Sequence, residues 1–222
     1  MDCSTLAPTF NANTITIRNT HTVTIISSSS ADQLTIDAGG TLVHSNGQSF
    51  TLNNGTGTDM TVNGTYVLNG TQPSGTGTIE IPRGGLVRVE GNAAPGESDD
   101  FAFGNANVTF RTGCTYEWAT TLFTPSWTAR TFFTIGENTR YLFSQTPSFA
   151  LGGANPTVIY GTLEATAPIT FTGAGTKTIA NGILGSAAID ASGSTEIFSS
   201  PEAQPVYWVE QDCSHCLQAL LI

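Results

Sequence analysis

Four cysteines are the first residues of this 222-residue chain whose type and spacing suggest chemistry. Cys213 and Cys216 form a Cys-x-x-Cys pair, with His215 between them, near the end of the sequence. A structural zinc site needs four ligands, and the other two cysteines, Cys3 and Cys114, lie far away in the chain. We therefore predict no metal site. We interpret Cys213 and Cys216 as a local disulfide or as two thiols in a terminal cap, and Cys114 as a small buried residue.

Carboxylates offer a second kind of chemistry at Asp99 and Asp100. Two adjacent acids serve as a general acid and a general base only when their environments separate their pKa values. No second cluster of Asp, His or Arg recurs about 25 residues away, the distance at which a repeating β-fold would bring it alongside Asp99 and Asp100. We expect Arg88 and Arg111 to face solvent. A solvated acidic loop is the simplest interpretation, and its oxygen atoms are also ligands suited to weak Ca²⁺ binding. We predict no other cofactor.

Nucleophilic catalysis has little support in the sequence. His21 and His44 fall at the edges of expected strands, and no Gly-x-Ser-x-Gly turn accompanies them. We therefore predict no catalytic residue.

Aromatic side chains are the third candidate. Tyr116, Trp118 and Trp127 lie in a threonine-rich context with little charge nearby. Exposed aromatic rings in such a context stack on sugar rings, so these three residues are the candidate carbohydrate-binding site. The alternative is that they fill the core, because aromatic residues are concentrated throughout positions 101–149.

Composition restricts the class of partner. Charged residues make up 11% of the chain, against about 25% in a typical soluble domain, and the formal net charge is −10. Phosphate binding needs clustered Lys and Arg, whereas Lys177 is the single lysine here, so we exclude a nucleic-acid partner. No run of about 18 apolar residues is present, so we expect no membrane insertion.

The elements that must position these residues are short β-strands. Segments such as 34–36, 60–62 and 86–89 alternate apolar with polar residues, which is the two-residue period of a strand with one buried face. Gly- and Asn-rich turns such as 37–40 separate them. The starts of these three strands are evenly spaced along the chain, but strands recur so often that this series alone does not establish a period.

An all-β fold follows, and a parallel β-solenoid is the architecture that we favour. A coil of about 22–26 residues with two or three strands would stack on the next coil about 4.8 Å away. The alternative is an antiparallel β-sandwich, in which Asn63-Gly64 is a hairpin turn. We expect one solenoid domain over residues 1–200, with an aromatic-rich middle at 101–149. Residues 201–222 would form a cap or tail with a short helix.

The phrases Leu34-Thr35-Ile36-Asp37-Ala38-Gly39-Gly40-Thr41-Leu42 and Met60-Thr61-Val62-Asn63-Gly64-Thr65 carry a resemblance. They resemble the strand-turn units of secreted right-handed β-helix modules in large bacterial surface proteins of the adhesin or passenger type. The resemblance covers roughly residues 13–198 and implies an extracellular or cell-surface location, flanking domains of a larger chain, and a spacer, adhesive or recognition role.

These observations favour a non-enzymatic extracellular module that presents a binding surface, with a glycan or a host or cell surface as its partner. A polysaccharide-active β-helix lyase or hydrolase is the first alternative. An ice-binding protein is the second, and it requires Thr-x-Thr pairs in register from coil to coil. Such pairs occur, for example at 14–16, 22–24 and 76–78, but not at one coil spacing.

Overall fold

Alternating side chains decide how each strand faces the core. In the segment Leu34–Ile36 both Leu34 and Ile36 are buried, whereas Thr35 between them is half-buried at the outer surface. The same inward and outward alternation recurs in Thr41–His44, Thr65–Leu68 and Thr78–Ile81. Removing the apolar side chains from water stabilises the fold by about 1.5–3 kcal/mol for each fully buried aliphatic residue.

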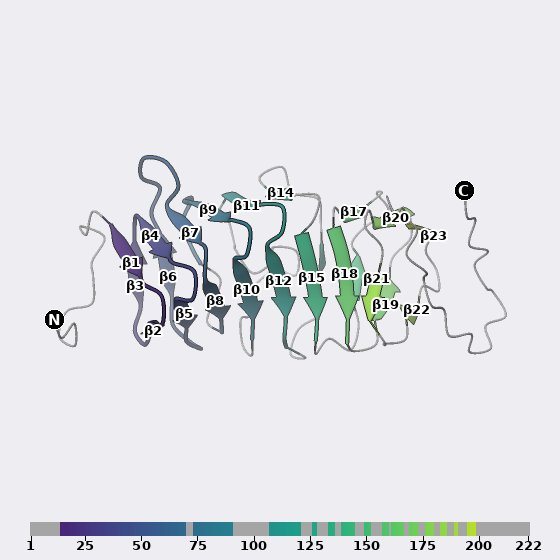
Figure 1. Ribbon diagram of the computed structural model, residues 1–222, viewed down its shortest axis with the longest axis horizontal. Helices are drawn as coiled ribbons and strands as arrows, with labels where there is room; N and C mark the ends of the chain where they lie inside the picture. Colours follow the sequence, from purple (N-terminus) through teal and green to yellow (C-terminus); the bar gives the residue numbers. More distant parts are fainter. Residues whose placement is uncertain are drawn as a thin grey trace.

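A computed structural model describes residues 14–69, 73–90 and 107–120, together with strand segments and two adjoining residues between 126 and 198. All pairs among the described strands are parallel, and the strands stack into a β-solenoid (Figure 1). The prediction of an all-β parallel solenoid is therefore confirmed, and the antiparallel sandwich is wrong. No helix occurs among the described residues, so they contain no helix that could cross a membrane.

The strands belong to five sheets, which we call A to E. Sheet A contains β1 (Ile15–Ile17), β4 (Leu34–Ile36), β7 (Met60–Val62), β9 (Thr78–Ile81), β11 (Asn107–Phe110) and β14 (Phe133–Ile135). Sheet B contains β2 (Thr22–Ile25), β5 (Thr41–His44), β8 (Thr65–Leu68), β10 (Leu86–Val89), β12 (Thr115–Trp118), β15 (Thr139–Phe143), β18 (Gly161–Ala165) and β21 (Ile183–Gly185). Figure 1 shows the sheet B strands side by side along the long axis of the molecule.

The remaining sheets are shorter. Sheet C contains β3 (Ser29–Ala31) and β6 (Phe50–Leu52), and the bridge from Thr51 to Ser74 extends it. Sheet D contains β13 (Ser126–Trp127), β16 (Phe149–Leu151), β19 (Ile169–Thr172) and β22 (Ile189–Asp190). Sheet E contains β17 (Thr157–Ile159), β20 (Thr176–Ile179) and β23 (Thr195–Phe198). The first two coils thus contribute one strand each to sheets A, B and C in turn.

The lengths of successive coils vary more than the sequence predicts. Ile15 lies in register with Leu34, which makes the first coil shorter than expected, whereas Ile79 lies in register with Val108, which makes that coil longer. The strands that begin at Leu34 and Met60 are register partners in sheet A, whereas Leu86 pairs with Thr65 in sheet B, so the three evenly spaced strand starts do not mark one period. Only the strands must stay in register, so the turns between them absorb these differences in length.

The Asn63-Gly64 turn is a corner between two sheets and not a hairpin. It connects β7 in sheet A to β8 in sheet B, and both amides donate to the Ile36 carbonyl of the preceding coil, at 2.8 and 3.0 Å. A Cβ atom on Gly64 would overlap the carbonyl oxygens of Asp37 and Gly40. Glycine is required here because the backbones of two coils approach closely.

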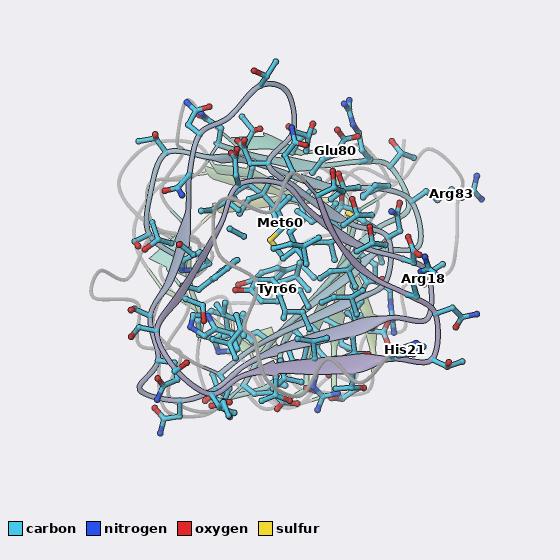
Figure 2. The ribbon with its side chains drawn as sticks, turned by 90° about the vertical axis from the view of Figure 1, so that its left-hand side faces the viewer. Arg18, His21, Met60, Tyr66, Glu80 and Arg83 are labelled. Atoms are coloured by element: carbon cyan, nitrogen blue, oxygen red, sulfur yellow. The ribbon has the colours of Figure 1, made fainter. Side chains whose placement is uncertain are left out.

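Inward side chains form continuous columns along the solenoid axis. Ile17, Ile36 and Val62 are partners in adjacent strands of sheet A and are almost completely buried. Figure 2, viewed along the axis, shows Met60 and Tyr66 inside the coil, whereas His21 and Arg83 lie at its periphery. Among the described residues the core is therefore a stack of mainly apolar layers.

The turn at Arg18–His21 contains a backbone conformation that its side chain disfavours. Thr20 has φ = 67°, and the corresponding residue of the next coil is Gly39, with φ = 79°. The Thr20 amide donates to the Gly39 carbonyl at 3.0 Å, so the two turns stack. A β-branched residue in the left-handed region costs roughly 1–2 kcal/mol.

Replacement of Thr20 by glycine is expected to raise the free energy of unfolding by about 0.5–1 kcal/mol, because the relieved strain exceeds the entropy cost of glycine. Urea unfolding followed by circular dichroism measures this change. Thr16→Gly is the matched control in strand β1 of the same coil, and it should lower stability. Equal destabilisation by both variants would contradict the strain argument.

Residues 201–222 lie outside the described residues, so the terminal cap or tail and its helix stay predictions. The same holds for most of the aromatic-rich middle. Its described aromatic side chains, Phe110, Tyr116 and Trp118, all lie in the core.

Candidate functional site

The structure places two of the three candidate carbohydrate-binding residues in the core. Tyr116 is fully buried and Trp118 is 2% exposed, and the Tyr116 ring packs edge-on against Phe110 with ring centroids 5.8 Å apart. Both side chains point inward because they alternate with Thr115 and Glu117 along β12. Neither ring can stack on a ligand from solvent, so their burial supports core filling.

Several other sequence-predicted residues fall outside the described part of the chain. These are Cys213 and Cys216, the Asp99-Asp100 pair and the side chain of Trp127, whose backbone forms part of β13. Cys114 is described; it is buried, as expected, and its thiol is free. Within the described residues no group of three or more His, Cys, Asp or Glu side chains is arranged to hold a metal ion.

The outer face of sheet B is the surface on which the fold assembles polar side chains from different coils. Its first three strands carry two columns in register, which we call the neutral patch. The first column is threonine throughout: Thr22, Thr41 and Thr65. The second column begins with threonine and continues with valine: Thr24, Val43 and Val67. Thr22 and Thr24 are exposed and the other four side chains are half-buried.

The pair Thr22 and Thr24 does not repeat in the next coil, as the sequence predicts, because its register partners are Thr41 and Val43. Single threonines do repeat, and a second column, Thr16, Thr35 and Thr61, lies on sheet A. Register between coils, which is invisible in the sequence, creates this order.

Charged side chains gather on the following strands of the same face. We call this group, together with Ser144, which bonds to one of its members, the charged strip; its charged members are Arg88, Glu90, Glu117, Arg140 and Glu164. Arg88 and Glu117 are direct partners in β10 and β12. Glu117 and Glu164 lie on the same column with Leu142 of β15 between them.

Ion pairs connect the charged strip across coils. Arg88 Nε lies 2.6 Å from Glu90 Oε1, and Arg88 Nη1 lies 3.3 Å from Glu117 Oε2. The Ser144 hydroxyl donates to Glu117 Oε1 at 3.1 Å, and Arg140 Nε lies 2.7 Å from Glu164 Oε2. The hydrogen bond to Glu164, aided by the charges of Glu164 and Glu117, raises the pKa of Arg140 against the opposing effect of burial.

Asp99 and Asp100 lie outside the described residues, so the expectation that no second cluster of Asp, His or Arg recurs one coil from them stays a prediction. Arg88 lies on the outer face as expected, but it contacts Glu117, its register partner in the next coil. The alternating pattern identifies both positions as outward. Their contact depends on the length of the coil between them, and coil length is variable here.

Glu117→Gln is expected to lower the free energy of unfolding by about 1–2 kcal/mol. The Glu117 side chain is only 10% exposed, so its loss of charge leaves Arg88 without one partner in a partly desolvated site. Chemical denaturation at low salt measures the effect. Glu164→Gln is the matched control, since that more exposed pair should contribute under about 1 kcal/mol. Equal effects would show that burial does not distinguish the two pairs.

The histidines occupy contrasting environments. His21 is exposed, and its Nδ1 lies 2.9 Å from the Asn19 carbonyl oxygen. His44 ends β5 and is fully buried, facing the core instead of a strand edge. Its Nε2 donates to the Gln48 carbonyl at 2.9 Å, which leaves Nδ1, 3.3 Å from the Tyr66 hydroxyl, to accept. Both ring nitrogens of neutral His44 are thereby used.

Stability should fall at mildly acidic pH because of His44. Burial lowers its pKa below the ordinary value of 6.5, although the hydrogen bond to Gln48 opposes this shift. His44 therefore binds a proton at a higher pH in the unfolded chain than in the folded chain. Its contribution to the free energy of unfolding is complete above about pH 6.5 and declines as the pH falls towards the lower pKa of the folded state. Burial also raises the pKa of the facing Tyr66, which stays neutral in this range.

Urea unfolding of the wild type at pH 7.5, 6.5 and 5.5 measures this decline. His44→Gln should be less stable at pH 7.5 but should lose less stability between pH 6.5 and 5.5. His21→Gln should follow the wild-type profile. Identical slopes for all three proteins would show that His44 does not cause the acid sensitivity.

Comparison with known proteins finds no matching family model, no similar curated protein and no similar solved structure.

Proposed function

We propose that this chain is a non-enzymatic extracellular module, a β-solenoid segment of a larger surface protein that presents an adhesive face to a glycan. The observation that carries the proposal is the neutral patch, in which three strands hold hydroxyl and methyl groups in register on one face of the sheet. Backbone pairing fixes these positions, and β-branched side chains have few rotamers, so the surface is ordered before any ligand arrives.

The solenoid itself supports the spacer part of this role. The eight strands of sheet B stack in one direction, and parallel strands lie about 4.8 Å apart, so the sheet extends for roughly 35 Å. Each coil contacts mainly its neighbours, an arrangement that suits a module holding a binding region away from a surface.

Glycan-array binding by the whole chain tests the adhesive role. We expect binding to a restricted set of glycans that survives at physiological salt, because an uncharged contact surface is not screened. Tyr116 and Trp118 are unsuitable mutation sites for this test, because truncating buried aromatic side chains would unfold the coil. Absence of binding to every glycan would overturn the adhesive part of the proposal.

A polysaccharide-active enzyme is the second candidate, and the charged strip is the observation that favours it. Glu117 and Glu164 lie on one column of the outer face, separated by a single strand, and two carboxylates flanking a bond can act as acid and base. Each carboxylate already forms an ion pair with an arginine, which a substrate would have to displace. Release of reducing ends from a polysaccharide by the wild type, abolished in Glu117→Gln, would favour this candidate.

A further inference from the structure

We propose that the neutral patch binds an uncharged polysaccharide strand that lies along the solenoid axis. This inference rests on the proposed adhesive function and specifies its surface and ligand class. The patch crosses β2, β5 and β8, with a column of threonine hydroxyls beside a column that is mainly valine. Figure 1 shows these three strands next to one another near the N-terminal end of the described solenoid.

The spacing of the patch suits a repeating ligand. Partner residues in adjacent parallel strands lie about 4.8 Å apart, so a threonine recurs at each step along the axis, with valine beside it on β5 and β8. A polysaccharide in extended form also repeats hydroxyl groups and apolar ring faces, at a similar distance per sugar. Three strands span about 10 Å, so we expect contact with two or three sugar rings.

Side-chain chemistry matches such a ligand in kind. The hydroxyls of Thr41 and Thr65 both donate and accept hydrogen bonds, as sugar hydroxyls do. Val43 and Val67 are half-buried in the neighbouring column and offer methyl groups to the apolar face of a ring. The threonine hydroxyls can therefore bind sugar hydroxyls while the valine methyl groups contact the apolar ring faces of the same polysaccharide strand.

The charge distribution favours an uncharged polysaccharide over an acidic polysaccharide or a second copy of the chain. All six side chains of the neutral patch are uncharged, whereas the chain has a formal net charge of −10. That charge repels an acidic polysaccharide and also repels a second copy of the chain. The next strand, β10, carries Arg88 with its ion pairs to Glu90 and Glu117, so the neutral surface ends there.

Paired threonine-to-valine variants test the inference with little disturbance of the strands. Thr41→Val with Thr65→Val removes two hydroxyls from the neutral patch. Thr35→Val with Thr61→Val is the matched control, because those threonines are register partners on sheet A in the same two coils. Binding of cellohexaose, chitohexaose and hexagalacturonate to the whole chain is measured by titration calorimetry, and thermal unfolding verifies that each variant is folded.

We expect the wild type to bind one of the two neutral oligosaccharides and not hexagalacturonate. The sheet B variant should bind at least tenfold more weakly, and the sheet A control should change by less than twofold. Equal affinity of the two variants, or binding of hexagalacturonate alone, would overturn this inference but leave the adhesive role standing. If neither neutral oligosaccharide binds but the glycan array still shows binding, this inference is overturned and the adhesive role stands. If the glycan array shows no binding either, the inference and the adhesive role are both overturned. Inhibition of ice growth that is lost in the sheet B variant, without oligosaccharide binding, would overturn the inference in favour of ice as the ligand.

Discussion

Replacement of Asp59 by alanine is expected to lower the free energy of unfolding by about 3 kcal/mol. Asp59 is fully buried immediately before strand β7, and both of its carboxylate oxygens accept hydrogen bonds. Oδ1 accepts from the Gly55 amide at 2.7 Å, and Oδ2 accepts from the Thr78 amide at 2.6 Å. The Thr78 hydroxyl lies 3.0 Å from Oδ2 and 2.8 Å from the Gly57 carbonyl oxygen.

The size of this effect follows from the amides that would lose their partner. Hydrogen bonds to a charged group contribute about 1.5–3 kcal/mol, and an unsatisfied buried donor costs about 1–3 kcal/mol. The side chain also fixes the 55–58 turn against the next coil, because Gly55 and Thr78 belong to different coils. Loss of Asp59 should therefore loosen the corner between sheets C and A.

Urea unfolding of Asp59→Ala, Asp59→Asn and Asp37→Ala tests the prediction. Asparagine keeps one acceptor oxygen, so Asp59→Asn should fall between the wild type and Asp59→Ala. Asp37 is a half-buried residue of the turn after β4, and its replacement should cost under about 1 kcal/mol. If Asp59→Ala is no more destabilising than Asp37→Ala, the structural role given to the Asp59 carboxylate is refuted.

Replacement of Gly85 by alanine is expected to destabilise the solenoid by about 2–3 kcal/mol. Gly85 precedes strand β10 at the corner between sheets A and B, and its added Cβ would overlap the Val62 carbonyl oxygen of the preceding coil. The same atom would lie 3.1 Å from the Pro82 carbonyl oxygen and 3.0 Å from a methyl group of Ile81. Backbone atoms cannot rotate away as a flexible side chain can, so the coils would have to separate.

Gly47→Ala separates this clash from the conformational cost of losing glycine. Gly47 has φ = 74°, but nothing lies within 4 Å of an added Cβ. That variant should cost only about 1–2 kcal/mol, from strain at positive φ. Thermal unfolding of both variants, followed by circular dichroism, compares the two effects. A greater loss in Gly47→Ala than in Gly85→Ala would contradict the importance of close packing between coils.

The solenoid could be predicted from the sequence because its main signal is local. Alternation in segments such as 34–36 and 60–62 indicates which side chains face inward, and Leu34, Ile36, Met60 and Val62 are buried as expected. Coil length could not be predicted in the same way. Strands that begin alike, such as those at Met60 and Leu86, belong to different sheets, because similar turns precede strands at more than one corner.

The candidate site was less predictable than the fold. The aromatic character of Tyr116 and Trp118 made both candidates for carbohydrate binding, but alternation along β12 directs both side chains into the core. The contact between Arg88 and Glu117 and the threonine column through Thr41 had no signal within any single strand. Both arise between coils, where no sequence period marks the partner.

By itself the sequence determined the all-β class, the inward or outward direction of most side chains, and a low charge that disfavours phosphate-rich partners. These properties depend on residue type and on a two-residue period, which are local. Only the tertiary structure decided which strands are neighbours, and thereby assembled the neutral patch and the charged strip. Parallel pairing joins residues whose separation along the chain differs from coil to coil, and variable turns together with close contacts at glycines such as Gly64 set each separation.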